Sequence, residues 1–428
     1  MSTNSAPRSQ WTRAADSPRV VIVGAGIGGL TLALELHAAG LSSVILEAAP
    51  ELRELGVGIN LLPHATRSLA RLRLLEALGA LAVTTKESVF YTRHGQLVYR
   101  EPAGRAAGYA WPQFSVHRGD LQRVLTDAVR DRLGDDSIRL DHRAVDFGQD
   151  DRRATVTVGH GDGSTSVVTG DVVVGADGVH SALRRYLHPA DNGARYTGCM
   201  MWRGTTVRPP FLSGGSMVRA GWLATGKLVA YPIRDRVDPA GNQLINWLAE
   251  VNGPERAQRD WTRRGQVDDF IAHFADWHFD WLDVPALFAG AQEVLEYPMV
   301  DSDPLPWWSG GRLTLLGDAA HPMVPRGSNG SAQAILDARS LAGWLADGGL
   351  TPDAALRAYD DERRTATAQV VLANRRNPPD ALLREVYERT GDRPFDRIED
   401  VIGPDEITAL MAAYRDIAGF SVEGLAQR

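Results

Sequence analysis

A glycine pattern near the N-terminus constrains the fold of this chain more than any other feature. Residues 20–23 read Val-Val-Ile-Val, and Gly24, Gly26 and Gly29 follow in GxGxxG spacing as a helical pattern begins. Four β-branched residues in succession are typical of a buried parallel strand. In this context the first glycine permits a tight turn, the second lets the backbone approach a pyrophosphate, and the third lets helix and strand pack closely. The pattern predicts a dinucleotide-binding βαβ unit.

An acidic residue stands where such a unit needs one. Glu47 ends a second strand-like run, residues 43–46, and lies eighteen residues after Gly29. A carboxylate at this place accepts hydrogen bonds from both hydroxyls of an adenosine ribose and repels a 2′-phosphate. We therefore expect the firmly bound dinucleotide to be FAD or NAD rather than NADP. The alternative is an ordinary βαβ unit with an incidental exposed glutamate.

Composition limits the partners of the chain. Of its 428 residues, 44% are hydrophobic and 23% charged, as in globular proteins with a large core. A net charge of -7 without a block of Lys or Arg argues against nucleic acid or an anionic membrane as a partner. Cys199 is the only cysteine, which excludes an intrachain disulfide and a Cys-based metal cluster, and we expect its side chain to be buried.

No apolar run is long enough to span a bilayer, and residues 1–18 lack the apolar region of a signal peptide. We expect a disordered lead-in and a cytoplasmic protein.

Periodicity and turn residues predict the other elements. We expect a hairpin around His94-Gly95, strands between 138 and 168, and helices at 30–39, 63–82, 118–133, 332–345, 354–375 and 407–417. Between about 198 and 298 the chain carries aromatic-rich strand candidates at 200–206, 227–233 and 243–247. A segment with helical spacing follows, containing Phe270, Phe274, Trp277 and Trp281. This region predicts an inserted β-rich domain whose sheet forms one wall of a cavity.

A second glycine-rich turn follows the strand-like residues 171–174. It reads Gly175-Ala176-Asp177-Gly178, and Ser181 stands where it can cap the next helix. The arrangement is typical of a ligand site at the carboxyl ends of parallel strands. Read alone, Asp177 is more often a turn aspartate than a ligand.

A third stretch follows the strand-like residues 313–316. There Asp318 emerges where a polyol hydroxyl can bind, and the loop 325–330 leads into a helix. A helix N-terminus aimed at a flavin pyrimidine stabilises negative charge on the reduced ring. One glycine-rich loop for the pyrophosphate and another for the isoalloxazine make FAD the predicted dinucleotide.

Two arginines are further candidates for cofactor contacts. Arg53 lies in a loop that continues to Gly58, where glycines let the backbone lie against a flat ring, and Arg118 begins a predicted helix. Either side chain can reach a phosphate, and Arg53 can alternatively be a surface residue.

Together these stretches resemble the FAD-dependent aromatic hydroxylases of the para-hydroxybenzoate hydroxylase type (group A flavoprotein monooxygenases) over residues 19–376. The GxGxxG motif matches the ADP site of that family, residues 175–178 match its Asp-Gly motif, and residues 317–322 match its second flavin motif. The residues expected to hold the cofactor are Gly24, Gly26, Ile27, Gly28, Gly29, Glu47, Arg53, Gly58, Arg118, Asp177, Asp318, Pro325, Gly327, Ser328 and Asn329.

The resemblance implies an α/β fold with three parts. A Rossmann-like FAD-binding domain on a doubly wound parallel sheet would comprise 19–85, 105–190 and 296–376. A β-rich substrate-binding domain would comprise 86–104 and 191–295. Residues 377–428 would form a helical extension that either covers the FAD-binding domain or makes a subunit contact.

Within the family the chain is most similar to the 5-methylphenazine-1-carboxylate 1-monooxygenase group. The sequence segments that it shares with this group are 56–60, 201–204, 274–277, 297–301, 303–306 and 331–337. Arg326 departs from that group, which has an uncharged residue there. The arginine allows an anionic or hydrogen-bonding substrate, unless it points into solvent. The expected substrate contacts are Trp202, Arg203, Tyr231, Trp247 and Arg326, with one or two of the three aromatic residues facing the ligand.

The resemblance implies an NAD(P)H-dependent monooxygenase. NADPH or NADH would dock transiently, and a flavin C4a-hydroperoxide would hydroxylate a small aromatic or N-heteroaromatic compound, with or without decarboxylation. A phenazine carboxylate is the favoured substrate. Because the flavin does the chemistry, the only catalytic candidates are Pro325 and His321, and a structural role is favoured for His321. No metal is expected, and the chain would be a monomer or homodimer.

Other functions remain open. The chain could be an FAD oxidoreductase that inserts no oxygen, an enzyme of N-oxidation or epoxidation, or a non-catalytic flavin-binding redox sensor.

Overall fold

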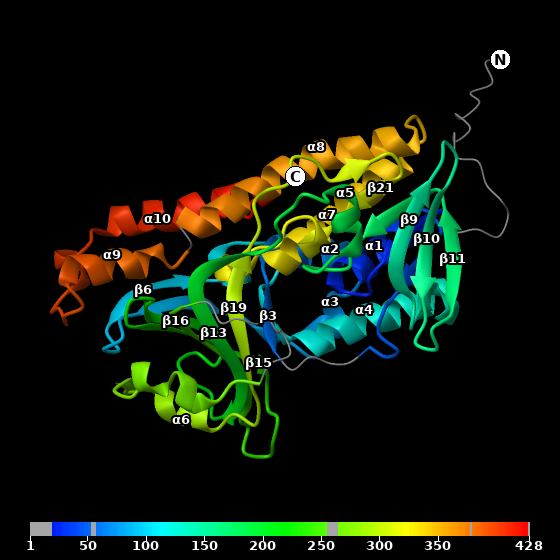
Figure 1. Cartoon of the computed structure of the whole chain (residues 1–428). Helices are drawn as coiled ribbons and strands as arrows, with labels where there is room; N and C mark the ends of the chain where they lie inside the picture. The colour runs from blue at the N-terminus through cyan, green and yellow to red at the C-terminus, as the bar shows by residue number, and fades with distance from the viewer. Residues whose placement is uncertain (1–18, 53–56, 255–263, 377–378, 427–428) are drawn as a thin grey trace.

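A six-stranded sheet lies in the main hydrophobic core of the computed structural model, whose whole chain is drawn in Figure 1. The structure describes residues 19–52, 57–254, 264–376 and 379–426. All neighbouring strands of this sheet pair in parallel except at the β20 edge. In spatial order they are β20 (Ser309–Gly310), β21 (Leu313–Leu315), β12 (Val172–Gly175), β1 (Val20–Val23), β2 (Ser43–Leu46) and β8 (Ile138–Arg139). The mixed α/β fold with a parallel sheet is the predicted one.

Helices and a small sheet pack around this centre. Helix α1 (Ile27–Ala38) contacts α4 (Arg118–Leu133) and α7 (Gly330–Ala346), and α7 contacts α8 (Pro352–Arg376). A three-stranded sheet of β9 (Arg143–Gln149), β10 (Ala154–Gly159) and β11 (Thr165–Gly170) contacts β1 and β12. A second small sheet consists of β3 (Gly58–Leu61), β7 (Phe114–His117) and β4 (Val83–Thr84).

The three glycine-rich turns meet at the carboxyl ends of β1, β12 and β21. Gly24 has φ +110°, and a Cβ there would overlap with the carbonyl oxygen of Ala176. Arg184 of α5 (Ala182–Leu187) donates to the carbonyls of Ala319 and Ala320, both at 3.2 Å. Backbone contact therefore joins the first turn to the second, and an arginine joins the second to the third.

A seven-stranded sheet forms the other large layer. Its order is β19 (Val294–Asp301), β13 (Arg195–Arg208), β16 (Gln243–Asn252), β15 (Gly226–Arg234), β14 (Ser216–Trp222), β5 (Glu87–Tyr91) and β6 (Leu97–Pro102). Only β14 and β5 pair in parallel. The strands come from residues 87–102 and 195–301, whereas the predicted boundaries between the two domains stay a prediction.

Most predicted helices and the hairpin are confirmed, and two helices are corrected. The predicted helix at 63–82 consists of α2 (Pro63–Arg71) and α3 (Leu75–Gly79), because Arg73 adopts φ 57° between them. No α-helix forms around Phe270–Trp281: the short 3₁₀ turn η3 (Val267–Asp269) precedes this segment, which contains the 3₁₀ turn η4 (Ile271–His273) and then β17 (His278–Phe279). Its aromatic rings instead pack as a cluster against the large sheet.

The C-terminal helices cover parts of both layers. Helix α9 (Ala381–Thr390) contacts β14, and α10 (Pro404–Ile417) contacts α8 and α9. Buried residues from β5, β6, α9 and α10 form one apolar cluster that includes Phe90, Val98, Leu382, Val386 and Met411. Figure 1 shows α9 and α10 at the β6 end of the molecule, beyond α8, and the short α11 is Val422–Ala426. Among the described helices, none combines the length and the apolar character needed to cross a membrane.

A buried ion cluster ties α7 to α8 and to the third turn. Asp337 accepts hydrogen bonds from His321 Nε2 (2.6 Å) and Arg363 Nε (2.8 Å), and its Oδ2 also accepts from the backbone N–H of Gly317 (3.2 Å). Burial would raise the pKa of the Asp337 carboxyl, but His321 and Arg363 outweigh it and hold the pKa below its ordinary value. The carboxylate is therefore ionised and stabilises the native state.

Replacing Asp337 with Asn should lower the free energy of unfolding by about 3 kcal/mol at pH 7, because the buried Arg363 guanidinium loses its counter-charge and His321 loses its carboxylate partner. A depressed carboxyl pKa contributes stability above its unfolded value and loses it as the pH falls through the native value. The difference between wild type and D337N should therefore narrow below about pH 4. Urea unfolding followed by tryptophan fluorescence measures both effects.

The matched control is Asp361→Asn, since the Asp361 side chain on α8 is 82% exposed. That variant should unfold like the wild type. Equal midpoints for D337N and D361N at pH 7 would contradict a stabilising role for the cluster.

Candidate active site

The three glycine-rich turns open onto one cavity of about 430 Å³. One wall consists of the turns themselves and the N-terminus of α1, and another consists of residues from β13, β14, β15, β16 and β19. The cavity therefore lies where the carboxyl ends of the parallel strands face the seven-stranded sheet, the place at which α/β folds bind ligands.

The N-terminus of α1 fits a pyrophosphate. Gly26, Ile27 and Gly28 line the cavity, and a Cβ at Gly26 would meet no protein atom within 4 Å. No side chain caps this helix, so its first backbone N–H groups are open to a ligand. Gly24 and Gly29 do not line the cavity; a Cβ at Gly29 would overlap with the carbonyl oxygen of Gly24.

Glu47 lies at the end of β2, beside the first turn. Its Oε2 accepts from the backbone N–H of Ala25 (2.8 Å) and its Oε1 from that of Ala49 (2.9 Å). A carboxylate has about four acceptor sites, so each oxygen keeps one for another donor. The glutamate is held in place beside the glycine turn and fits the hydroxyls of a ribose.

Arg118, Gly58 and Asp318 line the cavity next to these turns. The backbone N–H of Arg118 donates to the carbonyl of Val57 (2.8 Å). Burial lowers the pKa of the Arg118 guanidinium, and the nearby Asp318 carboxylate acts in the opposite direction. The two side chains therefore bring opposite charges to the cavity beside the turns. Arg53, the other predicted arginine, lies outside the described residues.

Asp177 is placed differently from the prediction. Its Oδ2 accepts from the backbone N–H of Ala182 (2.8 Å), and its neighbours Ala176 and Gly178, but not Asp177, line the cavity. The aspartate fixes the turn between β12 and α5, and Ser181 caps that helix through the N–H of Arg184 (2.9 Å), as expected.

The loop 325–330 forms the wall of the cavity at the N-terminus of α7. Pro325, Gly327, Ser328 and Asn329 all line it. Gly327 and Ser328 have φ values of 76° and 57°, in the left-handed region. The backbone therefore turns sharply before α7 begins, and the N-terminal end of that helix meets the cavity.

The pleat of the seven-stranded sheet decides which predicted substrate residues reach the cavity. Successive side chains point to opposite faces of a strand. Arg203 and Tyr231 line the cavity, whereas Trp202 and Trp247 lie on the other face, in the aromatic cluster with Phe270. This placement corrects the expectation for the two tryptophans, since one residue of register moves a side chain from the cavity to the core.

Arg203 also ties the seven-stranded sheet to β3. Its Nη2 donates to the carbonyl of Gly58 (2.7 Å), and Asn246 Oδ1 accepts from the N–H of Gly58 (2.7 Å). Both polar groups of Gly58 are thus bound by the seven-stranded sheet, which fixes β3 against the cavity.

A group of buried charges lies in the cavity wall, and of its members only Arg326 was predicted. Lys227 Nζ donates to both carboxylate oxygens of Glu250 (3.1 and 3.2 Å) and forms an ion pair with Asp380. Arg326 Nε lies 3.9 Å from Glu250 Oε2, and the Arg326 side chain is only 11% exposed. Arg326 therefore faces this group and not solvent. Arg219 lies in the same wall, where burial lowers its pKa and Asp380 acts against that shift.

The sequence contained a signal for some of these residues. Lys227 and Val229 share a strand face with Tyr231 at a spacing of two, so a lysine on an otherwise apolar face marked the cavity side of β15. Asp380 gave no comparable signal, because it comes from the start of the C-terminal helices.

His321 is not part of the cavity wall. Its ring is buried, is bound to Asp337 and lies 5.2 Å from the ring of Trp308. This geometry assigns it to the structural cluster below the third turn. In the described parts of the chain, no three His, Cys, Asp or Glu side chains gather in a way that could hold a metal ion. Cys199 is buried, and burial raises its pKa to about 12.

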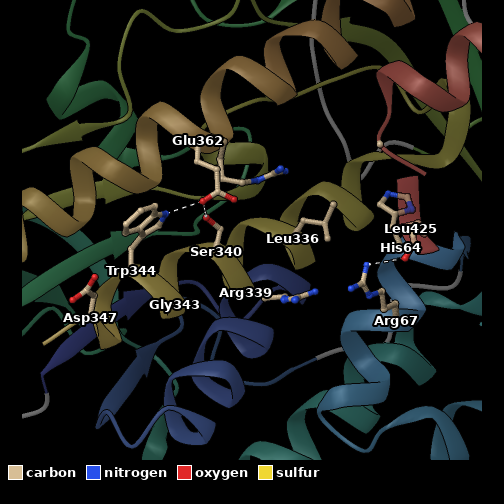
Figure 2. A pocket seen from close by; sticks show the side chains of 12 residues that line it. His64, Arg67, Leu336, Arg339, Ser340, Gly343, Trp344, Asp347, Glu362 and Leu425 are labelled. Atoms are coloured by element: carbon tan, nitrogen blue, oxygen red, sulfur yellow. Dashed lines mark hydrogen bonds between the residues drawn. The ribbon is translucent and has the colours of Figure 1, made fainter. Parts of the chain in front are cut away.

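A second hollow of about 480 Å³ lies between α2, α7, α8 and the C-terminal end of the chain (Figure 2). Figure 2 shows Arg67 and Arg339 pointing toward one another across it, while Glu362 accepts from Trp344 Nε1 (2.7 Å) and Ser340 Oγ (2.9 Å). None of the three glycine-rich turns opens onto this groove. The cavity beside those turns is therefore the candidate active site.

Comparisons with known proteins agree with this assignment. A family model described as "FAD binding domain" matches residues 18–374. Phenazine 1,6-dicarboxylic acid hydroxylase from Lysobacter antibioticus is 47% identical over 367 residues, which cover 83% of this chain and 89% of that protein. For 6-hydroxynicotinate 3-monooxygenase from Bordetella bronchiseptica the identity is 32%, with 82% and 89% covered.

Solved structures show the same fold. A salicylate hydroxylase in complex with its substrate superposes with a TM-score of 0.71 at 24% identity, covering 97% of this chain and 98% of that one. The family match spans most of the chain and includes all three glycine-rich turns. The chain therefore belongs to the FAD-binding group A aromatic hydroxylases and is an FAD-dependent aromatic monooxygenase.

Proposed function

We propose that this monooxygenase hydroxylates a phenazine carboxylate or a similar N-heteroaromatic acid, with NADPH or NADH as the electron donor. Bound FAD would supply the redox chemistry, accepting a hydride and inserting one oxygen atom from O2 into the substrate. The residues of the chain hold the cofactor, orient the substrate and exclude water.

The charge of the cavity wall is the observation that carries the proposal. Within the group of buried charges, the cations Arg219, Lys227 and Arg326 face two carboxylates, Glu250 and Asp380, so this group has one positive charge in excess. Arg326 Nε is buried without a hydrogen-bond partner among the described residues. A buried cation without a full set of partners is costly. A substrate carboxylate would supply both the charge and the acceptor.

The carboxylates of the wall stabilise the protonated, cationic form of Arg326. Burial would lower the pKa of the Arg326 guanidinium, but Glu250 and Asp380 outweigh it and raise the pKa. Lys227 and Arg326 likewise outweigh burial at Asp380 and lower its pKa. Arg326 would therefore be a fixed positive charge at neutral pH, while Tyr231 and Arg203 add hydrogen-bonding groups to the same face.

The relatives support an aromatic acid. One is a phenazine 1,6-dicarboxylic acid hydroxylase, and a relative from Streptomyces platensis that is 34% identical is a 3-amino-4-hydroxybenzoate 2-monooxygenase. The sequence segments that this chain shares with the 5-methylphenazine-1-carboxylate 1-monooxygenase group favour a phenazine. The proposal includes hydroxylation with or without decarboxylation, and either NADPH or NADH as the electron donor.

The donor would bind only during reduction. The chain has one dinucleotide fingerprint, and the acid at its ribose position suits FAD. NADPH or NADH would therefore approach the cavity transiently.

Product analysis tests the reaction. The purified flavoprotein should oxidise NADPH or NADH faster when phenazine-1-carboxylate is present, and mass spectrometry should show a product that gains one oxygen or exchanges CO2 for OH. Simple hydroxybenzoates serve as comparison substrates. Nicotinamide oxidation that yields only hydrogen peroxide with every phenazine would contradict the proposed substrate class.

Replacing Arg326 with Gln should weaken binding of phenazine-1-carboxylate at least about tenfold, because a desolvated charge-assisted hydrogen bond is lost. Binding of the uncharged parent phenazine should stay within about twofold, since it has no carboxylate to lose a partner. Both dissociation constants are measured by perturbation of the flavin absorbance.

The matched control is Arg236→Gln, because the Arg236 side chain is 82% exposed. It should bind both ligands like the wild type. Equal losses for phenazine and its carboxylate in R326Q would show a structural role for Arg326 and contradict carboxylate recognition.

A further inference from the structure

The loop 325–330 is held from outside by a residue of the C-terminal helices. Tyr414 of α10 accepts a hydrogen bond from Asn329 Nδ2 (2.8 Å) and donates to Asn374 Oδ1 (2.8 Å). Asn329 Nδ2 also donates to the carbonyl of Gly327 (3.1 Å). One tyrosine hydroxyl therefore links the loop at the cavity to the end of α8.

The fit between the loop and the tyrosine is also steric. A Cβ at Gly327 would overlap with the hydroxyl oxygen of Tyr414. Gly327 has no side chain, so the loop backbone lies directly on the phenol. The left-handed Ser328 next to it is an uncommon conformation for a residue other than glycine and depends on the surroundings to persist.

The contact is fully buried. Tyr414 is 4% exposed, and Asn329 and Asn374 are not exposed at all. Burial raises the pKa of the Tyr414 hydroxyl, so the phenol keeps its proton and donates it to Asn374. A buried amide that loses such a partner is left unsatisfied, which costs more than the net value of an ordinary hydrogen bond.

Other contacts fix α10 where Tyr414 needs it. Gln333, one turn into α7, donates to the carbonyl of Ala418 (3.3 Å), and Tyr109 Oη donates to the carbonyl of Phe420 (2.7 Å). Arg415 pairs with Glu101 of β6 (2.7 Å). The end of α10 is thus attached to α7, to the large sheet and to the segment before β7.

We propose that Tyr414 is a positioning residue that holds the loop 325–330 in the conformation that receives the flavin ring. The residue lies beyond position 374, where the match to the family model ends. The C-terminal helices thereby form part of the active site. This inference depends on flavin binding and is independent of which aromatic acid is the substrate.

The expected effect follows from conformational populations. If the loop leaves the binding conformation for part of the time, the apparent dissociation constant of the ligand rises by the reciprocal of the competent fraction. Loss of the Tyr414 hydroxyl leaves Asn329 and Asn374 without their shared partner, and the loop then has less to hold its left-handed residues. A distant structural defect would not act selectively on this loop.

Tyr414→Phe is the test variant because it removes only the hydroxyl and keeps the ring in its apolar cluster. Backbone amides 326–333 should exchange with deuterium about tenfold faster in the full-length apoprotein. The dissociation constant of FAD should rise by a similar factor, about tenfold, on titration of the same protein. The amide exchange needs no flavin, so it tests Tyr414 even if the proposed substrate or cofactor assignment fails.

The matched control is Tyr387→Phe in α9. The Tyr387 hydroxyl makes no hydrogen bond in the described part of the chain, and its ring is half-buried. Y387F should match the wild type in loop exchange and FAD affinity. If Y414F also matches it in both measurements, or if exchange rises equally throughout the chain, the positioning role is wrong.

A double variant gives an independent check. Asn329→Ala removes the other partner of the hydrogen bond, so Y414F combined with N329A should raise the FAD dissociation constant little beyond the larger single effect. Additive effects would show that the two residues act separately and would overturn the proposal.

Discussion

The structure depends on a contact between two backbones. Gly24 after β1 lies against Ala176 after β12 because no side chain separates them. This close approach places the turns that follow the two parallel strands side by side. Arg184 then attaches the third turn through two carbonyls. The N-terminus of α1, the polar residues near Asp318 and the loop before α7 thus open onto one cavity, although they are separated by almost three hundred residues of sequence.

Much of this arrangement is predictable because its causes are local. A run of β-branched residues, glycines at turns and a helical pattern specify the β1–α1 unit, and the same logic identified the turns after β12 and β21. Local sequence does not predict which side chains of the seven-stranded sheet point into the cavity and which point into the core. Trp202 and Arg203 are neighbours in sequence but lie on opposite faces, and aromatic character alone did not distinguish the core from the cavity. The register is decided by pairing with β16 and β19, which are distant in sequence.

The group of buried charges in the cavity wall was even harder to predict from the sequence than the faces of the sheet. Lys227, Glu250 and Asp380 come from β15, β16 and the start of the C-terminal helices. They form a charged group only because the fold brings these distant segments into contact. Each alone is an ordinary charged residue. Together they form a buried group that is stable only with paired charges, and Arg326 adds a cation that the group does not fully satisfy. In the proposed function, the affinity for a substrate carboxylate would depend on this excess positive charge, to which Arg326 contributes.

The C-terminal helices connect these two features. Asp380 precedes α9 and sets part of the charge of the wall, while Tyr414 on α10 supports the loop on which Arg326 itself lies. The same segment therefore acts on the electrostatics and on the shape of one cavity. Because Arg326 is next to Gly327, a displacement of the loop from Tyr414 would also move the guanidinium relative to Glu250 and Lys227. If the loop receives the flavin ring and Arg326 binds the substrate carboxylate, as proposed, cofactor position and substrate charge recognition would be coupled through this short loop.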